Sequence, residues 1–321
     1  MGEMTDPNPH HSSRVRALMW NLRIDAATAE VVAALRERGV ESVVLKGPAL
    51  SDWYPPDSGR TYVDGDVWVS PSLVAAAETV LSELGFTPTQ DERGLPAWWE
   101  EHGSSWFREQ DHGKIDLHRR LQGAGADPAQ TWELLWQRSE PLTVAELPAR
   151  RLDTAARALY VTLHAAHHGA GDTRGWPHLV AALAAVDDEG WGRALELATT
   201  LDALDSFSAG LRLLPAGAAL AARINVPAVR SVNATLHAAA PPPVALGFEQ
   251  LANASGIRRV QILLRKLVPP AGFVRHWWPP AAKNRPLLLV GYLYRPLWLL
   301  LRAPAGYRAW RGARREVKSS R

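Results

Sequence analysis

Three aspartates carry the spacing that is best suited to chemistry. Asp64 and Asp66 flank one glycine in the run 60–69 (RTYVDGDVWV), and Asp116 lies in the alternating run 114–118 (KIDLH). On a strand, residues two apart point to the same face, so Asp64 and Asp66 would present paired carboxylates. If the strand with Asp116 lies beside the first, three carboxylates converge on one site.

Neighbouring like charges are unfavourable on a strand unless a cation holds them, and hard oxygen ligands suit Mg²⁺ or Mn²⁺. Such a site could activate a hydroxyl for in-line phosphoryl chemistry. The alternative for Asp64-Gly65-Asp66 is a turn, because Asp-Gly is a common hairpin signal. On spacing alone the turn is the commoner outcome. Asp116 alone could equally be a solvated strand residue.

Residues upstream of the acidic pair favour a phosphate ligand. The run 43–50 reads as a strand, a turn at Gly47 and a helix start, and a helix start offers unpaired N–H groups to phosphate. Lys46 adds a point charge, although a solvent-facing strand end is the commoner fate of a single lysine. Arg60 would either bind phosphate or pair with Asp64.

Histidines give weaker signals. His118 would border the acidic cluster, where it would orient Asp116 or contact phosphate, and a histidine at the edge of the core is the alternative. His164 and His168 are four residues apart on a predicted helix, a geometry that can bind metal. The run lacks the Glu of a His-Glu-x-x-His motif, so we expect a structural or substrate-facing role rather than a zinc site.

The elements that must position these residues alternate between helix and strand. Apolar periodicity predicts helices over 14–38 and 71–84, the second capped by Ser70. We expect one or two helical turns over 48–54, and strands over 41–46, 62–69, 104–108 and 114–118. This alternation indicates an α/β unit.

The composition changes after residue 122. A linker-like stretch at 123–127 leads to a region whose helical periodicity runs over most of 153–267. The predicted domains are an α/β domain over 14–122, a helical domain over 128–268 and a Pro/Trp-rich basic amphipathic tail over 269–321.

Composition excludes several classes of protein. Hydrophobic residues make up 46% of the 321 positions, so global disorder is excluded. The chain has no cysteine, which excludes a disulfide scaffold, a thiol nucleophile and a Cys-ligated zinc site. The net charge of +3 averages two unlike parts: residues 255–321 hold fifteen Lys/Arg against Glu316 alone, and residues 1–254 hold 21 bases and 32 acids.

Three partners fit the basic tail, whose charges are interleaved with Trp and Tyr: anionic lipid, nucleic acid, or the acidic body of the same protein. We rank the body and a membrane surface above nucleic acid, because no nucleic-acid-binding motif is present. The apolar stretch 286–301 is divided by Arg295 and Pro296 and is too short to span a bilayer. The N-terminus lacks the pattern of a signal peptide. We expect a cytoplasmic protein with peripheral contact to an anionic membrane.

Several motifs occur in an order that resembles the uncharacterised nucleotidyltransferase family, within the polymerase-β-like superfamily. They are Leu45-Lys46-Gly47, Tyr54-Pro55, Arg60…Asp64-Gly-Asp66-Val-Trp-Val69, Leu84-Gly85-Phe86 and Ile115-Asp116-Leu117-His118. The run from Leu163 to Leu179 and the later Leu293-Tyr-Arg-Pro-Leu297 are also similar to family segments. The resemblance covers about residues 15 to 300.

The resemblance implies an α+β fold, with an N-terminal mixed sheet flanked by helices and followed by a mainly helical C-terminal domain. It implies Mg²⁺- or Mn²⁺-dependent transfer of NMP from an NTP to a hydroxyl of a small molecule or peptide. Asp64, Asp66 and Asp116 would bind metal and carry the catalysis. Lys46, Gly47, Arg60 and His118 would bind the nucleotide.

Two departures from the superfamily pattern weigh on this interpretation. Lys46-Gly47 stands where a Gly-Ser pair usually contacts the triphosphate, and Gly65 stands where a hydrophobic residue anchors the strand. A glycine inside a strand weakens it or marks a bulge, which leaves the relative orientation of Asp64 and Asp66 open. The alternative function is therefore a catalytically degenerate nucleotide- or partner-binding protein, associated with a membrane surface through its basic tail.

Overall fold

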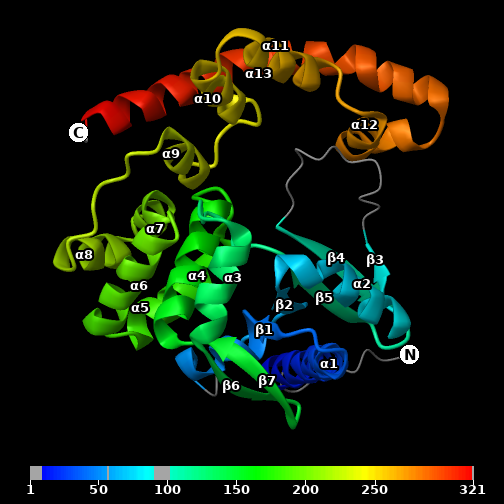
Figure 1. Cartoon of the computed structure of the whole chain (residues 1–321), viewed down its shortest axis with the longest axis vertical. Coiled ribbons are helices and arrows are strands. Elements are labelled where there is room, and N and C mark those ends of the chain that lie inside the picture. The colour runs from blue at the N-terminus through cyan, green and yellow to red at the C-terminus, as the bar shows by residue number, and fades with distance from the viewer. Residues whose placement is uncertain (1–8, 56–57, 90–101, 320–321) are drawn as a thin grey trace. The chain divides into compact units, whose positions relative to one another are not determined.

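The computed structural model describes residues 9–55, 58–89 and 102–319 (Figure 1). The chain divides into two compact units. Unit 1 comprises the described residues of 1–90, 102–161 and 178–201, and unit 2 comprises those of 162–177 and 202–321. Each unit is described by itself below.

A seven-stranded sheet is the centre of unit 1. Its strands are β1 (Ser42–Val44), β2 (Gly65–Val69), β3 (Thr87–Pro88), β4 (Gly103–Arg108), β5 (Gly113–His118), β6 (Ser139–Val144) and β7 (Leu147–Leu152). Their order is β3-β4-β5-β2-β1-β7-β6. The pairs β2–β5 and β1–β7 are parallel and the other pairs are antiparallel, so the sheet is mixed.

Alternating side chains of β2 pack on both faces of the sheet. Val67 and Val69 join the core formed with helix α1 (Pro9–Glu37), whose Val31 and Leu35 are fully buried. Trp68 points to the opposite face, where its ring meets Trp132 of helix α3 (Pro128–Gln137) edge-on at 4.8 Å. Because both faces are covered, every residue of β2 is buried.

The helices, in chain order, complete the two units. They are α1 (Pro9–Glu37), α2 (Val74–Glu83), α3 (Pro128–Gln137), α4 (Thr154–His168), α5 (Trp176–Ala185), α6 (Asp188–Thr200), α7 (Leu204–Leu211), α8 (Pro215–Arg223), α9 (Val232–Ala238), α10 (Ala245–Asn253), α11 (Gly256–Leu267), α12 (Ala271–Trp277) and α13 (Arg285–Ser319). Short 3₁₀ helices are η1 (Gly47–Trp53), η2 (Pro71–Leu73), η3 (Thr173–Gly175) and η4 (Pro279–Ala282). The predicted fold class, a mixed sheet flanked by helices and followed by a mainly helical C-terminal region, is confirmed.

Local predictions differ from the structure in three places. The strand expected from residue 62 begins at Gly65. Ser70 caps no helix with its side chain, because its hydroxyl bonds Ser72 and the chain first makes the 3₁₀ turn η2. The predicted apolar face of the first helix is only half used: Leu18 and Met19 are exposed, since the sheet covers only the later turns of α1.

The β6–β7 hairpin was not predicted. It lies inside the range 128–268 assigned to the helical domain, yet Arg151 of β7 pairs in parallel with Val44 of β1. The sheet therefore includes residues beyond the predicted boundary at 122. The exact domain boundaries stay a prediction.

Unit 2 is helical. A small core of Leu236, Ala245 and Ala313 joins α9, α10 and α13. Helix α13 is 35 residues long and includes two prolines, Pro296 and Pro304. Of the helices in the described ranges, none has a stretch that is long and apolar enough to cross a membrane.

Candidate active site

The predicted carboxylates lie on one face of the sheet, opposite α1. Asp66 of β2 and Asp116 of β5 are direct partners in the parallel pair. Their neighbours Gly65 and Ile115 are also partners and point to the α1 side. Since side chains alternate along a strand, Asp66 and Asp116 share the other face. The structure thus brings these two predicted residues together, at adjacent positions on neighbouring strands.

Asp66 is buried and ion-paired. One of its oxygens, Oδ1, accepts from Lys46 Nζ at 2.8 Å and from His118 Nε2 at 2.8 Å, and the side chain is only 2% exposed. Burial alone would raise the pKa of Asp66, but Lys46 and His118 lower it well below its usual value. The carboxylate is therefore ionised, and His118 must carry its proton on Nε2 to donate to it.

This contact corrects the role expected for His118. The sequence placed it beside Asp116, whereas its ring nitrogen bonds Asp66. Asp116 instead has a partner on β4, because Ser105 Oγ donates to Asp116 Oδ1 at 2.6 Å. Ser105 had no sequence signal, because the antiparallel pairing of β4 with β5 alone brings it opposite Asp116.

Asp64 lies at the bend just before β2. Its Oδ2 accepts from Lys114 Nζ of β5 at 3.0 Å, so Lys114 is a second cation of the cluster. Burial raises the pKa of Asp64, and the negative charges of Asp66 and Asp116 raise it further against the opposing effect of Lys114. Through Lys114, Asp64 is thus tied to β5, the strand that carries Asp116.

Lys46 is the centre of the charge balance. Burial would lower its pKa, but Asp66, and after it Tyr160 and Asp64, raise it above its ordinary value. Lys46 follows β1 and belongs to the buried cluster, so the alternative of a solvent-facing strand end is wrong. Burial also raises the pKa of Tyr160 on α4, where Lys46 opposes the rise and Asp66 adds to it.

Gly65 is required by the packing of α1 against β2. A Cβ built on Gly65 would lie 2.0 Å from Thr28 Oγ1 and 3.2 Å from Ile115 Cδ1. Thr28 is fully buried and its hydroxyl donates to Ile24 O within α1. Gly65 is therefore a close-approach position in a regular strand pair rather than a sign of a bulge.

The donor chemistry of the cluster fits a hard divalent cation only in part. Three carboxylates are the ligand type that Mg²⁺ prefers. However, two ammonium groups, Lys46 and Lys114, already hold Asp66 and Asp64. Among the described residues, no group of three or more His, Asp or Glu side chains is arranged to hold a metal ion. Metal binding would require these lysines to leave the carboxylates.

Arg60 lies beside the turn at Gly47 among tyrosines, and its predicted phosphate binding stays a prediction. Its Nη1 donates to Gly47 O at 2.9 Å, and the guanidinium lies over the rings of Tyr54 and Tyr62 at 4.3 and 5.3 Å. It forms no pair with Asp64, which lies with Lys114. Two further nitrogens, Nε and Nη2, are buried without a hydrogen-bond partner in the described structure. Burial lowers the pKa of Arg60, and the opposing effect of Tyr54, Tyr62, Asp25 and Asp66 does not offset it.

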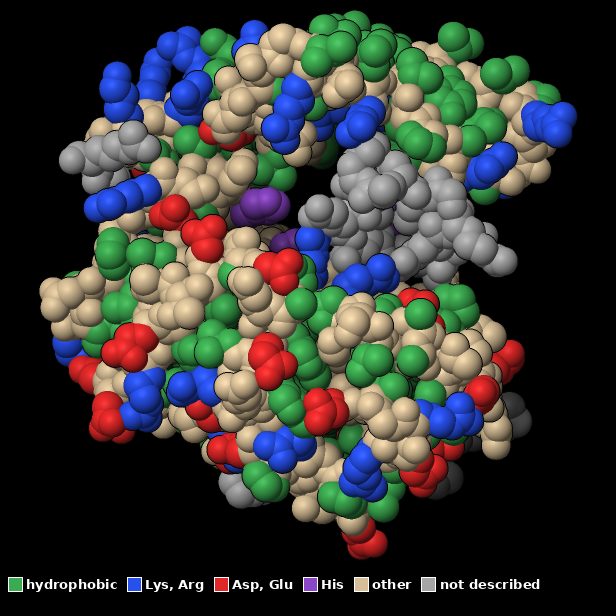
Figure 2. Space-filling view, in the orientation of Figure 1, with side chains coloured by type: hydrophobic (Ala, Val, Ile, Leu, Met, Phe, Trp, Pro, Cys, Tyr) green, Lys and Arg blue, Asp and Glu red, His purple; other side chains and the backbone are tan. Residues whose placement is uncertain are grey.

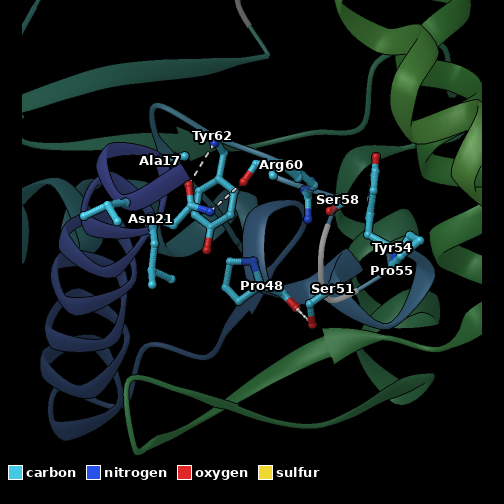
Figure 3. A pocket seen from close by; sticks show the side chains of 12 residues that line it. Ala17, Asn21, Pro48, Ser51, Tyr54, Pro55, Ser58, Arg60 and Tyr62 are labelled. Carbon is cyan, nitrogen blue, oxygen red and sulfur yellow. Dashed lines mark hydrogen bonds between the residues drawn. The ribbon is translucent and has the colours of Figure 1, made fainter. Parts of the chain in front are cut away.

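A pocket of about 580 Å³ adjoins Arg60 (Figure 3). It is lined by residues of α1, η1 and the segment before β2, among them Asn21, Ser51, Tyr54, Ser58 and Tyr62. Asn21 fixes this segment, because its side-chain amide donates to Arg60 O and its oxygen accepts from Tyr62 N. The pocket therefore combines aromatic rings, hydroxyls and an arginine with unused donors.

His178 was missed as a neighbour of this site. It lies on α5, is half-buried, and shares a hydrogen bond with the Tyr54 hydroxyl at 2.7 Å. Burial, together with the charges of Arg60 and Lys46, lowers the pKa of His178 to about 3. His178 and Tyr54 are 124 positions apart, and only the tertiary fold brings them together.

The histidines of α4 form a separate group in unit 2. The rings of His164 and His168 are 4.6 Å apart, and His168 Nδ1 lies 2.8 Å from Asp172 Oδ2. Burial, with His168 and His237 nearby, lowers the pKa of His167 to about 4. Among the described residues, this group is not part of a cluster of three or more His, Asp or Glu side chains that could hold a metal ion.

Comparisons with known proteins agree with the resemblance seen in the motifs. A model of the family described as uncharacterised nucleotidyltransferase matches residues 11–216. Among solved structures, the antibiotic-resistance factor ANT(2'')-Ia is 14% identical and has a TM-score of 0.41, covering 56% of this chain and 94% of that one. An antigenic nucleotidyltransferase-like protein from Paracoccidioides brasiliensis is 10% identical with a TM-score of 0.35, covering 58% and 91%. No curated protein matches the sequence.

Proposed function

This chain belongs to the uncharacterised nucleotidyltransferase family, and we propose that it transfers NMP from an NTP to a hydroxyl of a small molecule or peptide. The observation that supports this most strongly is the in-register pair Asp66 and Asp116, with Asp64 close by, on one face of the sheet. Carboxylates gathered at one place on a sheet are the ligand type that a divalent cation prefers, and perturbed carboxylates cluster at functional sites.

We assign roles from the contacts of each side chain. Asp64 and Asp66 would bind Mg²⁺ or Mn²⁺, which supplies charge neutralisation at the phosphates when bound. Asp116 would bind metal or accept the proton of the attacking hydroxyl. Oxygen attack at the α-phosphorus forms the new P–O bond and breaks the bond to pyrophosphate, which leaves.

The two lysines would act as exchangeable counter-ions. Lys46 and Lys114 balance the carboxylates in the ligand-free chain. On nucleotide binding their ammonium groups would move to the triphosphate, which carries more negative charge than the carboxylates they leave. This exchange reconciles the predicted phosphate-binding role of Lys46 with its observed contact to Asp66.

Arg60 would bind the nucleotide at the edge of the cluster. Its two unpartnered nitrogens, Nε and Nη2, can form the paired hydrogen bonds that phosphate or carboxylate accepts. Gly47, whose carbonyl holds Arg60, would keep it in place. His118 would act through Asp66, which it orients, rather than by contacting phosphate. The tyrosine-lined pocket beside Arg60 offers space for the base or the acceptor.

Isothermal titration with ATP, GTP, CTP and UTP in the presence of Mg²⁺ tests the binding half of this proposal. We expect one nucleotide to bind the wild type and binding to be lost in Asp64→Asn/Asp66→Asn. The matched control Glu41→Gln/Glu78→Gln removes two carboxylates of unit 1 outside the cluster and should bind like the wild type. Equal binding by all three proteins would contradict the assigned site.

The second candidate is a degenerate protein that binds nucleotide without turnover. The lysines on Asp66 and Asp64 favour it, because they occupy the carboxylates that catalysis needs. Pyrophosphate release from the bound nucleotide, measured with pooled cytoplasmic small molecules and peptides as acceptors, separates the two. Release by the wild type that Asp116→Asn abolishes supports the transferase; tight binding without release supports the degenerate protein. Both functions fit the cytoplasmic location that we propose.

A further inference from the structure

Helix α11 exposes an apolar face. None of its residues is buried, and Ile257, Val260 and Leu264 are 77%, 53% and 56% exposed. These residues recur every three or four positions, so they share one side of the helix. Arg258, Arg259 and Arg265 lie on the other side, and the helix as a whole is strongly amphipathic. A free helix of this type is costly in water unless its apolar face is covered.

The exposed face of helix α13 is aliphatic in its first half and basic in its second. Leu289, Leu293, Leu297 and Leu300 are exposed at spacings of three and four residues. The same spacing continues on that face through the exposed Arg308, Arg311, Arg315 and Lys318. In the space-filling view, hydrophobic side chains gather over α11 and α13, with Lys and Arg side chains around them (Figure 2). One surface thus offers an aliphatic patch and a basic patch end to end.

An apolar groove of about 290 Å³ lies among α10, α11 and α13. Phe248 and Leu251 of α10, Leu263 and Leu267 of α11, and Leu300 of α13 line it. Its lining is almost entirely hydrocarbon, and the one charged residue is Lys266. A groove of this chemistry fits an acyl chain better than any polar ligand.

Two cations sit together beside the groove without an acidic partner in the described structure. Arg295 Nε donates to Lys266 O, and the guanidinium lies over Phe273 and Trp277, each at 4.7 Å. Its Nη1 is buried with no hydrogen-bond partner. Burial, and then the charge of Arg295, lowers the pKa of Lys266. An anion placed here would relieve the desolvation of both groups.

We propose that α11 and the exposed face of α13 form a surface that docks in the plane of an anionic phospholipid bilayer, with the α10–α11–α13 groove taking an acyl chain and Lys266 meeting a lipid phosphate. Segment 255–321 has fifteen bases and one acid, so it complements such a surface in charge. Basic residues near an anionic bilayer and leucines that enter its hydrocarbon each strengthen such binding. This inference does not rest on the proposed transferase activity.

Nucleic acid fits this surface less well. Stacking of bases needs free aromatic faces, but Trp277 and Trp298 carry arginine guanidinium groups, from Arg295 and from Arg302 respectively. Tyr294, an exposed aromatic residue between them, already stacks on Trp277. The exposed Leu289, Leu293 and Leu297 of the same stretch offer no hydrogen bond to a base edge or a phosphate. Because none of the described helices is long and apolar enough to cross a bilayer, the fitting mode is interfacial.

Co-sedimentation of the full chain with vesicles tests the proposal. We expect binding to phosphatidylcholine vesicles that contain phosphatidylglycerol and at least tenfold weaker binding to phosphatidylcholine alone. Leu264→Glu/Leu293→Glu should lower the affinity by roughly 100-fold, since two leucines no longer enter the hydrocarbon. Arg311→Glu/Arg315→Glu should also lower it and should weaken its salt dependence, because the net charge of the segment falls from +14 to +10. Val180→Glu, the same change at an exposed apolar residue of unit 1, should bind like the wild type.

Three results would overturn the proposal. One is equal binding of the wild type and Leu264→Glu/Leu293→Glu, with circular dichroism showing that both are folded. Another is a stable dimer in light scattering that the leucine variant dissociates while neither protein binds vesicles, which would make the face a contact between copies. The third is single-stranded RNA binding that Arg311→Glu/Arg315→Glu abolishes, without binding to vesicles.

Discussion

The charged groups of the acidic site in the sheet have partners within the chain, whereas most of those in the C-terminal helices are exposed to solvent. In the sheet, each carboxylate has a partner within hydrogen-bond distance: Asp66 has Lys46 and His118, Asp64 has Lys114, and Asp116 has Ser105. In α11 and α13 the bases far outnumber the acids of the same segment and, apart from Lys266 and Arg295, are exposed. Buried charges must be balanced by other groups of the chain, whereas exposed charges stay solvated and can bind an external partner.

The comparison predicts that substitutions in the sheet change stability and that similar substitutions in the C-terminal helices change binding only.

Removing the Asp66 charge should have the largest effect. Asp66→Asn leaves the buried Lys46 ammonium without its carboxylate, so we expect the free energy of unfolding to fall by ~3–5 kcal/mol. Urea denaturation measures this. Lys46→Met/Asp66→Asn should recover most of the loss, because neither charge then remains. If the double variant is no more stable than Asp66→Asn, the unpaired charge of Lys46 is not the cause of the lost stability.

Adding one methyl group at Gly65 should have the next largest effect on stability. The new Cβ of Gly65→Ala would overlap Thr28 Oγ1, and overpacking of this kind costs ~1–3 kcal/mol. Thermal unfolding of Gly65→Ala and Gly65→Ala/Thr28→Ala checks the cause, since the second variant removes the clashing hydroxyl. If Thr28→Ala restores nothing, the contact with α1 does not explain this glycine.

The lowered pKa of His178 predicts that the stability of the folded chain depends on pH. Its pKa falls from 6.5 to about 3 in the folded chain, so the unfolded chain takes up the proton first as the pH drops. Stability that is fully present above pH 6.5 is therefore lost toward pH 3, by at most ~1.4 kcal/mol per pH unit for one histidine. Urea unfolding between pH 7 and pH 4 should show a shallower slope for His178→Gln than for the wild type. An unchanged slope would mean that His178 is protonated in the folded state.

The smallest effect on stability is expected from a substitution on the exposed face of α13. Leu293 is 79% exposed, so Leu293→Glu should change the free energy of unfolding by no more than about 0.5 kcal/mol in the absence of vesicles. Urea denaturation of this variant, side by side with Asp66→Asn, compares the two regions directly. A loss of several kcal/mol would show that this face is covered in the free protein, which would contradict the comparison.

The sequence predicted the part of the site that follows from strand alternation. Asp66 and Asp116 share a face because each lies in a period-two run, and register then makes them neighbours. Their counter-ions could not be predicted in the same way. Lys114 is two residues from Asp116, yet only the parallel pairing with β2 brings it to Asp64.

Other features were missed because their signals are tertiary or unusual. The β6–β7 hairpin turns through Ala145 and Glu146, both with positive φ, where Asn-Gly is the usual signal. Ser70 has a capping side chain, but the chain makes a 3₁₀ turn first. The pairing of Tyr54 with His178 joins residues 124 positions apart and depends wholly on the packing of α5.

The central claim is that the three carboxylates bind a metal–nucleotide complex once their lysines move away. Electron paramagnetic resonance of Mn²⁺, titrated with a non-hydrolysable NTP, measures this without knowledge of the acceptor. We predict that the wild type and Glu41→Gln/Glu78→Gln remove free Mn²⁺ in the presence of nucleotide and that Asp64→Asn/Asp66→Asn does not. Equal Mn²⁺ binding by all three proteins would contradict the claim.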